Sequence, residues 1–303
     1  DMGLNLSGMT TETRNPRTMQ LDQMSPLEIV TVMNEEDARV PLAIAKCLPQ
    51  IAQAVTWAAE SFEKGGRLFY MGAGTSGRLG VLDAAECPPT FGVPKEMVVG
   101  LIAGGEKAFI EAVEGAEDSR ELAVEDLKAH GLTANDLVVG IAASGRTPYV
   151  LGGLDYAKSV GCHTAAIACN IGSAIGKAAE LAIEVNCGPE VLTGSTRLKS
   201  GTAQKLILNM ISTGSMVRTG KAYQNLMVDV QQTNEKLHTR AENIVIDATG
   251  VEREKARAAI DAAGGSVKTA ITMLLADCDA AEAARRLEKA RGHVREAIRL
   301  EVL

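Results

Sequence analysis

Residues 67–78 read R-L-F-Y-M-G-A-G-T-S-G-R, an apolar run that stops in a turn of glycine, threonine and serine before a helix-like segment begins. The pattern predicts a β-strand that leads into the N-terminus of a helix. Such a turn presents backbone N–H groups without helical partners at the positive end of the helix dipole. Gly74 lies in this turn, and Thr75 and Ser76 add hydroxyl donors. We therefore expect an anion here, and a phosphate fits best.

Downstream of this strand, short apolar runs alternate with helical stretches. The runs are 68–71, 98–103, 137–143, 164–168 and 181–185. The alternation is typical of an α/β fold in which five strands form a doubly wound parallel sheet with helices on both faces. In such sheets ligands bind beyond the carboxyl ends of the strands, where the strand order reverses. Functional residues are therefore expected at those ends.

The segments outside the sheet predict three parts. Residues 1–24 show little apolar periodicity and predict an extended N-terminal arm. Ser25 begins a helical pattern, so N-terminal helices are expected to precede the sheet in a main domain over residues 25–246. Residues 247–303 are alanine-rich with glycine breaks and predict a small C-terminal domain of three helices.

Composition argues against several classes of partner. The net charge is −7 and aromatic residues are 3% of the chain, so neither a basic field nor stacking platforms for a nucleic acid are expected. No apolar stretch reaches the about 20 residues of a membrane span, and nothing resembles a signal peptide. The six cysteines lack the spacing of metal ligands and predict buried thiols in a reducing compartment. We expect a cytoplasmic protein without metal, membrane or nucleic-acid partners.

A second turn repeats the composition of the first. The third strand ends in A-A-S-G-R-T, residues 142–147, where Ser144 and Gly145 begin a second Ser-Gly-Arg. The fifth strand leads into G-P-E-V-L-T-G-S-T-R-L-K-S-G, residues 188–201, a long polar loop before an apolar helix expected over about 203–217. Two turns that each offer a hydroxyl, a glycine and an arginine favour a single phosphomonoester carried by a sugar.

A dinucleotide is the alternative ligand of the first turn. Residues 72–77 satisfy G-x-G-x-x-G after a strand, the fingerprint of dinucleotide-binding folds. That fingerprint also requires an acidic residue roughly 20 residues further on to hold a ribose. The nearest candidate, Glu106, lies later than that and follows two glycines. The phosphomonoester is therefore preferred.

Two carboxylates lie where catalysis can use them. Glu86, in D-A-A-E-C-P-P, comes one helical stretch after the first turn, and Pro88-Pro89 is expected to end the helix there. Glu117, in E-G-A-E-D-S, is expected to end the helix after the second strand. From spacing alone, each also fits a solvated surface acid. A pair of carboxylates suits proton transfer in two directions, one accepting and one donating.

Five stretches carry a specific resemblance to a known family. They are G-A-G-T-S-G-R-L-G, D-A-A-E-C-P-P, E-G-A-E-D-S-R, G-I-A-A-S-G-R-T-P-Y and G-P-E-V-L-T-G-S-T-R-L-K-S-G-T-A-Q-K. They resemble the N-acetylmuramic acid 6-phosphate etherases of the sugar isomerase (SIS) domain superfamily, and residues 188–205 look like a signature shared with glucokinase regulatory proteins. The resemblance implies a flavodoxin-like SIS fold, a homodimer, a sugar-phosphate substrate and no cofactor or metal. It also implies cleavage of the D-lactyl ether of N-acetylmuramic acid 6-phosphate in peptidoglycan recycling.

The resemblance also implies roles for individual residues. Glu86 matches the family's acid that protonates the departing lactate, and Glu117 matches its second catalytic glutamate. Ser76, Ser144 and Thr147 match the phosphate-binding hydroxyls of SIS domains. These residues are therefore expected to meet in one site, with the backbone of Gly74 and Gly145 beside the phosphate.

The polar loop over residues 188–201 supplies further candidates. Lys199 and Arg197 are cations that can stabilise an enolate-like charge, or else solvated loop charges. Glu190 can bind a sugar hydroxyl or support the loop. Ala142 stands where sugar isomerases often carry a serine, so backbone N–H groups are expected to replace that contact.

Two other functions remain open from the residues alone. An aldose-ketose isomerase also moves a C2 proton on a sugar phosphate, but it needs no acid at C3, which would leave Glu86 idle. A non-catalytic sugar-phosphate sensor needs only binding residues, but the regulatory proteins are much longer and duplicate the SIS domain. The etherase is preferred because both Glu86 and Glu117 are present in a short chain.

Overall fold

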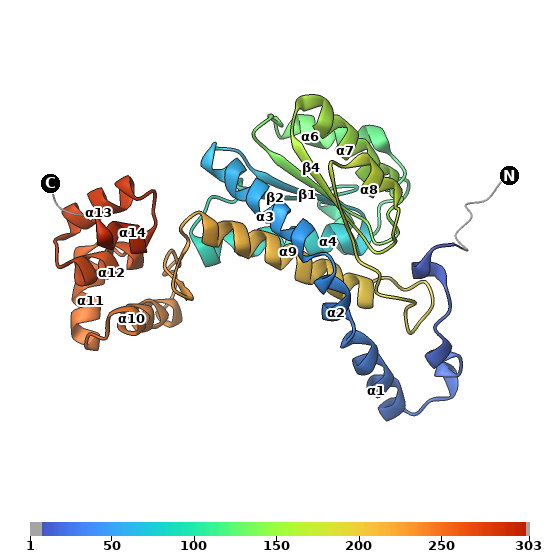
Figure 1. The fold of residues 1–303 in the computed structure, drawn as a ribbon, viewed down its shortest axis with the longest axis horizontal. Coiled ribbons are helices and arrows are strands. Elements are labelled where there is room, and N and C mark those ends of the chain that lie inside the picture. Colours follow the sequence, from blue (N-terminus) through green and yellow to red (C-terminus); the bar gives the residue numbers. More distant parts are fainter. Residues whose placement is uncertain (1–7, 301–303) are drawn as a thin grey trace. The chain divides into compact units, whose positions relative to one another are not determined.

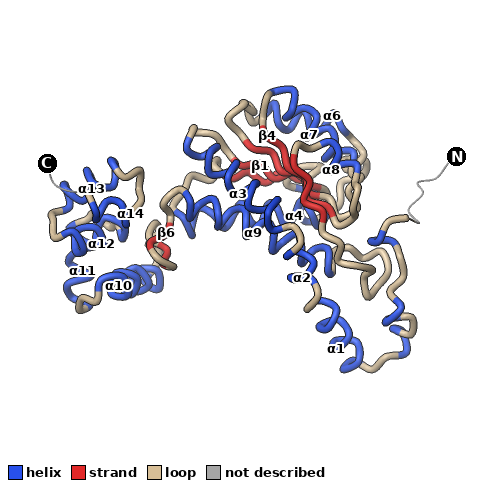
Figure 2. The backbone as a smooth tube through the Cα atoms, in the orientation of Figure 1, coloured by secondary structure: helices blue, strands red, loops and turns tan. Residues whose placement is uncertain are grey.

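A central parallel sheet organises the main part of the molecule. The computed structural model describes residues 8–300. Figure 2 shows the strands of the sheet side by side. The five strands lie in the order β2-β1-β3-β4-β5. They are β1 (Leu68–Gly72), β2 (Val98–Ile102), β3 (Leu137–Ile141), β4 (His163–Ala168) and β5 (Leu181–Glu184). All neighbouring strands pair in parallel, and Leu68 is in register with Val98 on one side and Leu137 on the other. The predicted doubly wound, five-stranded sheet is confirmed.

Helices cover both faces of this sheet. Figure 1 shows α6, α7 and α8 over one face and α3, α4 and α9 along the other. Their bounds, with the short α5 after β2, are α3 (Leu48–Glu63), α4 (Gly74–Phe91), α5 (Lys107–Ile110), α6 (Arg120–Ala129), α7 (Pro148–Val160), α8 (Ala174–Ala178) and α9 (Lys199–Arg218). Within β1 the Tyr70 hydroxyl donates to Asp83 of α4 at 2.7 Å, whereas Met71 packs with the core cluster of α6 and α7. Strands buried on both faces are near-continuous apolar runs, which is why the sequence locates them within two residues.

The first of the helices that precede the sheet begins where the sequence predicts, at Ser25. The Ser25 hydroxyl accepts the N–H of Glu28 at 3.2 Å, and the Glu28 carboxylate accepts the N–H of Ser25 at 3.3 Å. This capping box satisfies two donors at the start of the helix. The helices are α1 (Pro26–Asp37) and α2 (Val40–Ala45).

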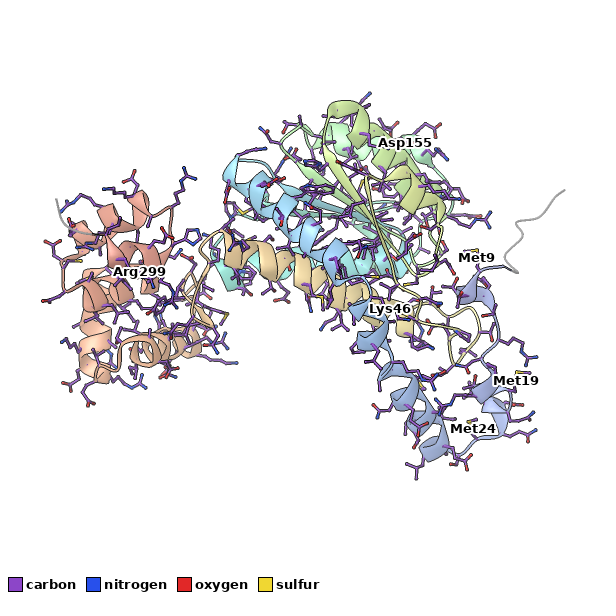
Figure 3. All side chains as sticks on the ribbon, viewed as in Figure 1. Met9, Met19, Met24, Lys46, Asp155 and Arg299 are labelled. Carbon is purple, nitrogen blue, oxygen red and sulfur yellow. The ribbon has the colours of Figure 1, made fainter. Side chains whose placement is uncertain are left out.

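Residues 8–24 do not form the extended arm that the sequence predicts over residues 1–24, of which residues 1–7 lie outside the described part of the chain. They form three short 3-10 helices, η1 (Thr10–Glu12), η2 (Pro16–Thr18) and η3 (Leu21–Gln23). The buried Thr18 hydroxyl donates to the carbonyl of Val191 at 2.8 Å, and the Asn15 amide donates to that of Pro189 at 3.1 Å. The segment is ordered by polar contacts with the loop after β5, which leave no apolar periodicity in the sequence. Figure 3 marks its course with the labels Met9, Met19 and Met24.

Helix α4 continues through the two prolines that were predicted to end it. Pro88 and Pro89 lie inside the helix, which ends at Phe91. Proline removes a hydrogen-bond donor and crowds the preceding turn, but its carbonyl still accepts. The N–H of Gly92 donates to the Pro88 carbonyl at 2.9 Å. Because both prolines lie in the last turn, the helix loses two bonds and still closes.

The contacts of the described chain divide it into two compact units. One comprises residues 8–85 and 96–212, and the other residues 86–95 and 213–300. The second unit contains β6 (Ala222–Tyr223), β7 (Leu226–Met227), α10 (Glu235–Thr249), α11 (Arg253–Ala262), α12 (Val267–Ala276), α13 (Ala280–Lys289) and α14 (Val294–Arg299). Domain limits at 24/25 and 246/247 stay a prediction. Among residues 8–300, no helix combines the length and the apolar character that crossing a bilayer requires.

The C-terminal segment has one more helix than the sequence predicts. Four helices, α11 to α14, lie between residues 253 and 299, where three were expected. Asp277 ends α12 in a left-handed conformation with φ 51°, and the Asp279 side chain then accepts the N–H of Glu282 to start α13. The end of α12 and the cap of α13 are only two residues apart, and neither involves a glycine. A prediction that places helix ends at glycines therefore counts α12 and α13 as one helix.

Candidate functional site

The turns after β1 and β3 lie at the topological switch point of the sheet. From β1 the chain moves outward to β2 and then returns to β3 on the other side of β1. The turn after β1 starts α4 at Gly74, with φ +55°, and the turn after β3 contains Gly145, with φ +78°. Both turns expected to bind phosphate are therefore neighbours at the edge where doubly wound sheets bind ligands.

The first turn of α9 lies against the first turn of α4. The Ser76 hydroxyl donates to the side-chain oxygen of Gln204 at 2.6 Å. A Cβ atom on Gly201 would lie 3.8 Å from the methyl group of Thr75. The loop after β5 therefore brings the start of α9 to the predicted phosphate turn.

The turn after β3 is held from two sides. The Ser144 hydroxyl accepts the N–H of Arg146 at 3.2 Å, and the Ser144 carbonyl accepts the Asn170 amide at 3.0 Å. A Cβ atom on Gly145 would lie only 2.4 Å from the Cβ of Ser173. Glycine is therefore required here both by its φ and by the close approach of the β4 loop.

Glu190 caps α9 with a side chain from the preceding loop. Its fully buried carboxylate accepts the N–H groups of Lys199 at 2.9 Å and Ser200 at 3.2 Å. Burial raises the pKa of this carboxyl, while the two N–H groups and the Lys199 charge oppose the rise. A negative charge at a helix N-terminus is favourable. The helix consequently starts at Lys199 rather than at the predicted residue 203, because its cap is nine residues upstream, too far for a sequence capping rule.

Glu117 was expected at the end of a helix, but it lies beside the start of α7. Helix α5 ends at Ile110, and Glu117 lies in the turn before Ser119, the N-cap of α6. The Glu117 carbonyl accepts the N–H of Tyr149 at 2.9 Å, and its side chain is exposed. Thr147, at the N-cap of α7, is buried and its hydroxyl makes no capping bond. A predicted catalytic carboxylate and a predicted phosphate-binding hydroxyl thus flank the same helix start.

Glu86 lies on α4, the helix that begins at the phosphate turn. Its side chain is exposed. The segment from 86 to 95 belongs by its contacts to the second unit. The part of Glu86 in catalysis therefore stays a prediction.

A cavity of about 600 Å³ opens beside the turn after β3. Its polar lining includes Ser144, Asn170 and Ser173. Among the described residues that line it, Arg146 and Lys177 are cations and none is acidic. The charge of this cavity favours an anionic ligand close to Ser144.

Two supporting residues of the site were missed in the sequence. Gln204 accepts the Ser76 hydroxyl, and Asn170 holds the Ser144 carbonyl. Asn170 lies two residues after the end of β4, so its place at a strand's carboxyl end was a usable signal. Gln204 lies within a helix, and nothing in its local sequence marks it.

Models of two protein families match the chain. The glucokinase regulatory protein N-terminal SIS domain matches residues 50–158, and the SIS domain matches residues 121–213. Among solved structures, phosphoheptose isomerases from Francisella tularensis and Neisseria gonorrhoeae each align with a TM-score of 0.50 at 18% identity. The first covers 64% of this chain and 100% of its own, and the second 62% and 98%. These structures show a shared fold.

Full-length relatives identify the family more closely. The N-acetylmuramic acid 6-phosphate etherase of Exiguobacterium sp. is 63% identical over 293 residues, which cover 97% of this chain and 100% of the relative. The protein of the same name from Serratia proteamaculans is 61% identical over 295 residues, or 97% and 99% of the two chains. The chain therefore belongs to the N-acetylmuramic acid 6-phosphate etherase family, which is built on the SIS domain.

Proposed function

We propose that this protein cleaves the D-lactyl ether of N-acetylmuramic acid 6-phosphate, giving N-acetylglucosamine 6-phosphate and D-lactate in peptidoglycan recycling. The observation that carries the proposal is the 61–63% identity to etherases over 97% of the chain. The site is compatible with it, because two glycine- and hydroxyl-bearing turns lie together at the switch point and suit one phosphomonoester.

The protein binds the substrate mainly through its phosphate group. In this proposal the backbone of Gly74 and Gly145 approaches the phosphate closely. The hydroxyls that donate to it are those of Thr75, Ser76, Ser144 and Thr147. Lys199 completes the binding site from the start of α9, beside the phosphate turn, and Glu190 supports that helix start because its two oxygens accept the N–H groups of Lys199 and Ser200.

The reaction is an elimination followed by a hydration. Opening of the sugar ring makes C1 an aldehyde, which acidifies the proton on C2. Removal of that proton and breakage of the C3–O bond leave a C2=C3 double bond, and the bond electrons go to the lactate oxygen. Water then adds its oxygen to C3 and a proton returns to C2. The enzyme is thus proposed to be a carbon–oxygen lyase.

Two glutamates share the proton transfers. Glu117 takes the C2 proton, and Glu86 protonates the lactate oxygen, because an alkoxide is a poor leaving group. The resulting Glu86 carboxylate then activates the incoming water. Lys199 is the cation that stabilises the enolate-like charge as it develops.

The assembly and the compartment belong to the same proposal. We expect a homodimer, as the family resemblance implies. We also expect the cytoplasm, since five of the six cysteines are buried, as small apolar residues of the core are. Thiols of this kind suit a reducing compartment.

The experiment is to incubate the purified protein with N-acetylmuramic acid 6-phosphate in ¹⁸O-labelled water. The expected result is enzyme-dependent release of D-lactate without ¹⁸O in its hydroxyl, and sugar phosphate with ¹⁸O at C3. Label in the lactate hydroxyl would contradict cleavage of the C3–O bond. No lactate from this substrate, together with conversion of a 2-hydroxy aldose phosphate into its ketose, would indicate the isomerase instead, and binding without turnover would indicate the sensor.

A further inference from the structure

A buried carboxylate on α1 is surrounded by cationic side chains beside the site. The side chain of Glu36 is 2% exposed and lies among three cations. The guanidinium groups of Arg17 and Arg39 reach one of its oxygens at 3.5 and 3.3 Å. The Lys199 ammonium lies 3.7 Å from the other oxygen, to which the Asn15 amide also donates.

The Lys199 end of this cluster is almost completely enclosed. Its side chain is 3% exposed, and a Cβ atom on Gly188 would lie 3.8 Å from Nζ. The backbone N–H of Lys199 is bound by Glu190. Within residues 8–300, no hydrogen bond from Nζ is formed; its ion pair is with Glu36, and the Glu190 carboxyl also lies within range of its charge.

A buried ammonium requires a counter-charge, since an unpaired one is strongly disfavoured. Glu36 supplies that charge, and at 3.7 Å it attracts Nζ without occupying its N–H donors. Burial opposes ionisation of Glu36, but the Asn15 hydrogen bond and the cations outweigh it and lower its pKa. The donors of Lys199 are therefore left for a ligand.

Asn15 connects this carboxylate to the loop that carries the site. Its amide donates to Glu36 and to the carbonyl of Pro189. Pro189 immediately precedes Glu190, the cap of the helix that Lys199 begins. The N-terminal segment, α1 and the start of α9 are thus joined through Glu36 and Asn15.

We propose that Glu36 is a positioning residue that holds the Lys199 ammonium in place for the transition state of the sugar phosphate. This rests on the proposed function and adds that α1, outside the sheet, sets the geometry of the reacting cation. Asn15 supports the same role from the N-terminal segment.

A double-mutant cycle tests the proposal. Glu36→Gln and Lys199→Met are made singly and together, and kcat and KM for lactate release are measured. We expect Glu36→Gln to lower kcat at least about fivefold, within the range for residues in contact, with KM changed less than kcat. In the Lys199→Met background, Glu36→Gln is expected to lower kcat by less than about twofold. The matched control is Arg39→Gln, which removes a 62% exposed partner of the same carboxylate and is expected to keep the parental kcat.

Two results would overturn the positioning role. One is an equal loss from Glu36→Gln with and without Lys199, and the other is a loss in Arg39→Gln as large as in Glu36→Gln. If Glu36→Gln does not fold, Asn15→Ala takes its place in the cycle with the same expectation. If the parental protein releases no lactate, the proposed function fails. The free energy of unfolding of the single and double variants is then measured in urea instead of kcat. Coupling of at least about twofold in the unfolding constant still supports the ion pair, and additive effects overturn it.

Discussion

Replacing Gly145 by alanine tests whether the turn after β3 is fixed by its contact with the β4 loop. The new Cβ would lie 2.4 Å from the Cβ of Ser173, and an ordinary contact begins at 3.4 Å. One of the two must therefore move by at least 1.0 Å, the difference of these values. Ser173 cannot yield easily, because its N–H donates to the Glu184 carboxylate of β5 at 2.6 Å and its hydroxyl caps α8.

The magnitude follows from two separate costs. At φ +78° an alanine is strained by roughly 1–2 kcal/mol relative to glycine. The lower conformational entropy of the unfolded alanine variant offsets about 0.4–1 kcal/mol of this strain. The overlap adds roughly 1–3 kcal/mol, as overpacking does. We expect Gly145→Ala to lower the free energy of unfolding by about 1.5–4 kcal/mol.

A matched control separates strain from overlap. Gly172 lies in the loop that Gly145 contacts and has φ +67°, and none of the described atoms lies within 4 Å of the position that its Cβ would take. Gly172→Ala therefore carries only the strain, about 0.5–1 kcal/mol. Urea unfolding followed by fluorescence measures both, because Trp57, the only tryptophan, lies on α3 in the same unit and stacks on His163. Equal losses in the two variants, or a Gly145→Ala protein with parental lactate release, would refute the reasoning.

Two further predictions concern groups around the sheet. Burial raises the folded-state pKa of Glu190, so its contribution to stability is present below the ordinary value of about 4.3 and is lost as the pH rises through the raised value. Relative to the parental protein, Glu190→Gln should therefore gain stability as the pH rises above about 4.3, measured by urea unfolding across pH, and a constant difference would count against it. Asp136→Ala removes the 2% exposed partner of Arg67 at the amino end of the sheet and should cost about 3 kcal/mol. The folded Asp136→Ala protein should keep its kcat/KM, and a loss of activity beyond the unfolded fraction would contradict this separation.

Apolar pattern was sufficient to predict the sheet. Strands buried on both faces must be apolar along their whole length, and because β1 and β3 are neighbours, the turns that carry Ser76 and Ser144 follow adjacent strand ends. The prediction of the phosphate turns needed only this topology and the glycines. It did not need any long-range contact.

Long-range polar contacts account for most of what the sequence missed. The cap of α9 comes from Glu190 and the ordering of the N-terminal segment from Asn15 and Thr18, each through hydrogen bonds to distant residues. Such contacts produce no periodic pattern of apolar residues from which they could be predicted. Glu36 was missed for the same reason, since on α1 it is one acid among several and only the fold surrounds it with cations.

Exchange of the C2 hydrogen tests the proposed elimination most directly. Each variant is incubated with N-acetylmuramic acid 6-phosphate in deuterium oxide, and deuterium at C2 and free lactate are followed together. Glu86→Gln is expected to exchange C2 while releasing lactate at least about 100-fold more slowly, the usual effect of losing a general acid. Glu117→Gln is expected to lose both exchange and release. Lactate release by the parental protein without deuterium at C2 of the product, or parental exchange by Glu117→Gln, would contradict proton removal from C2 by Glu117.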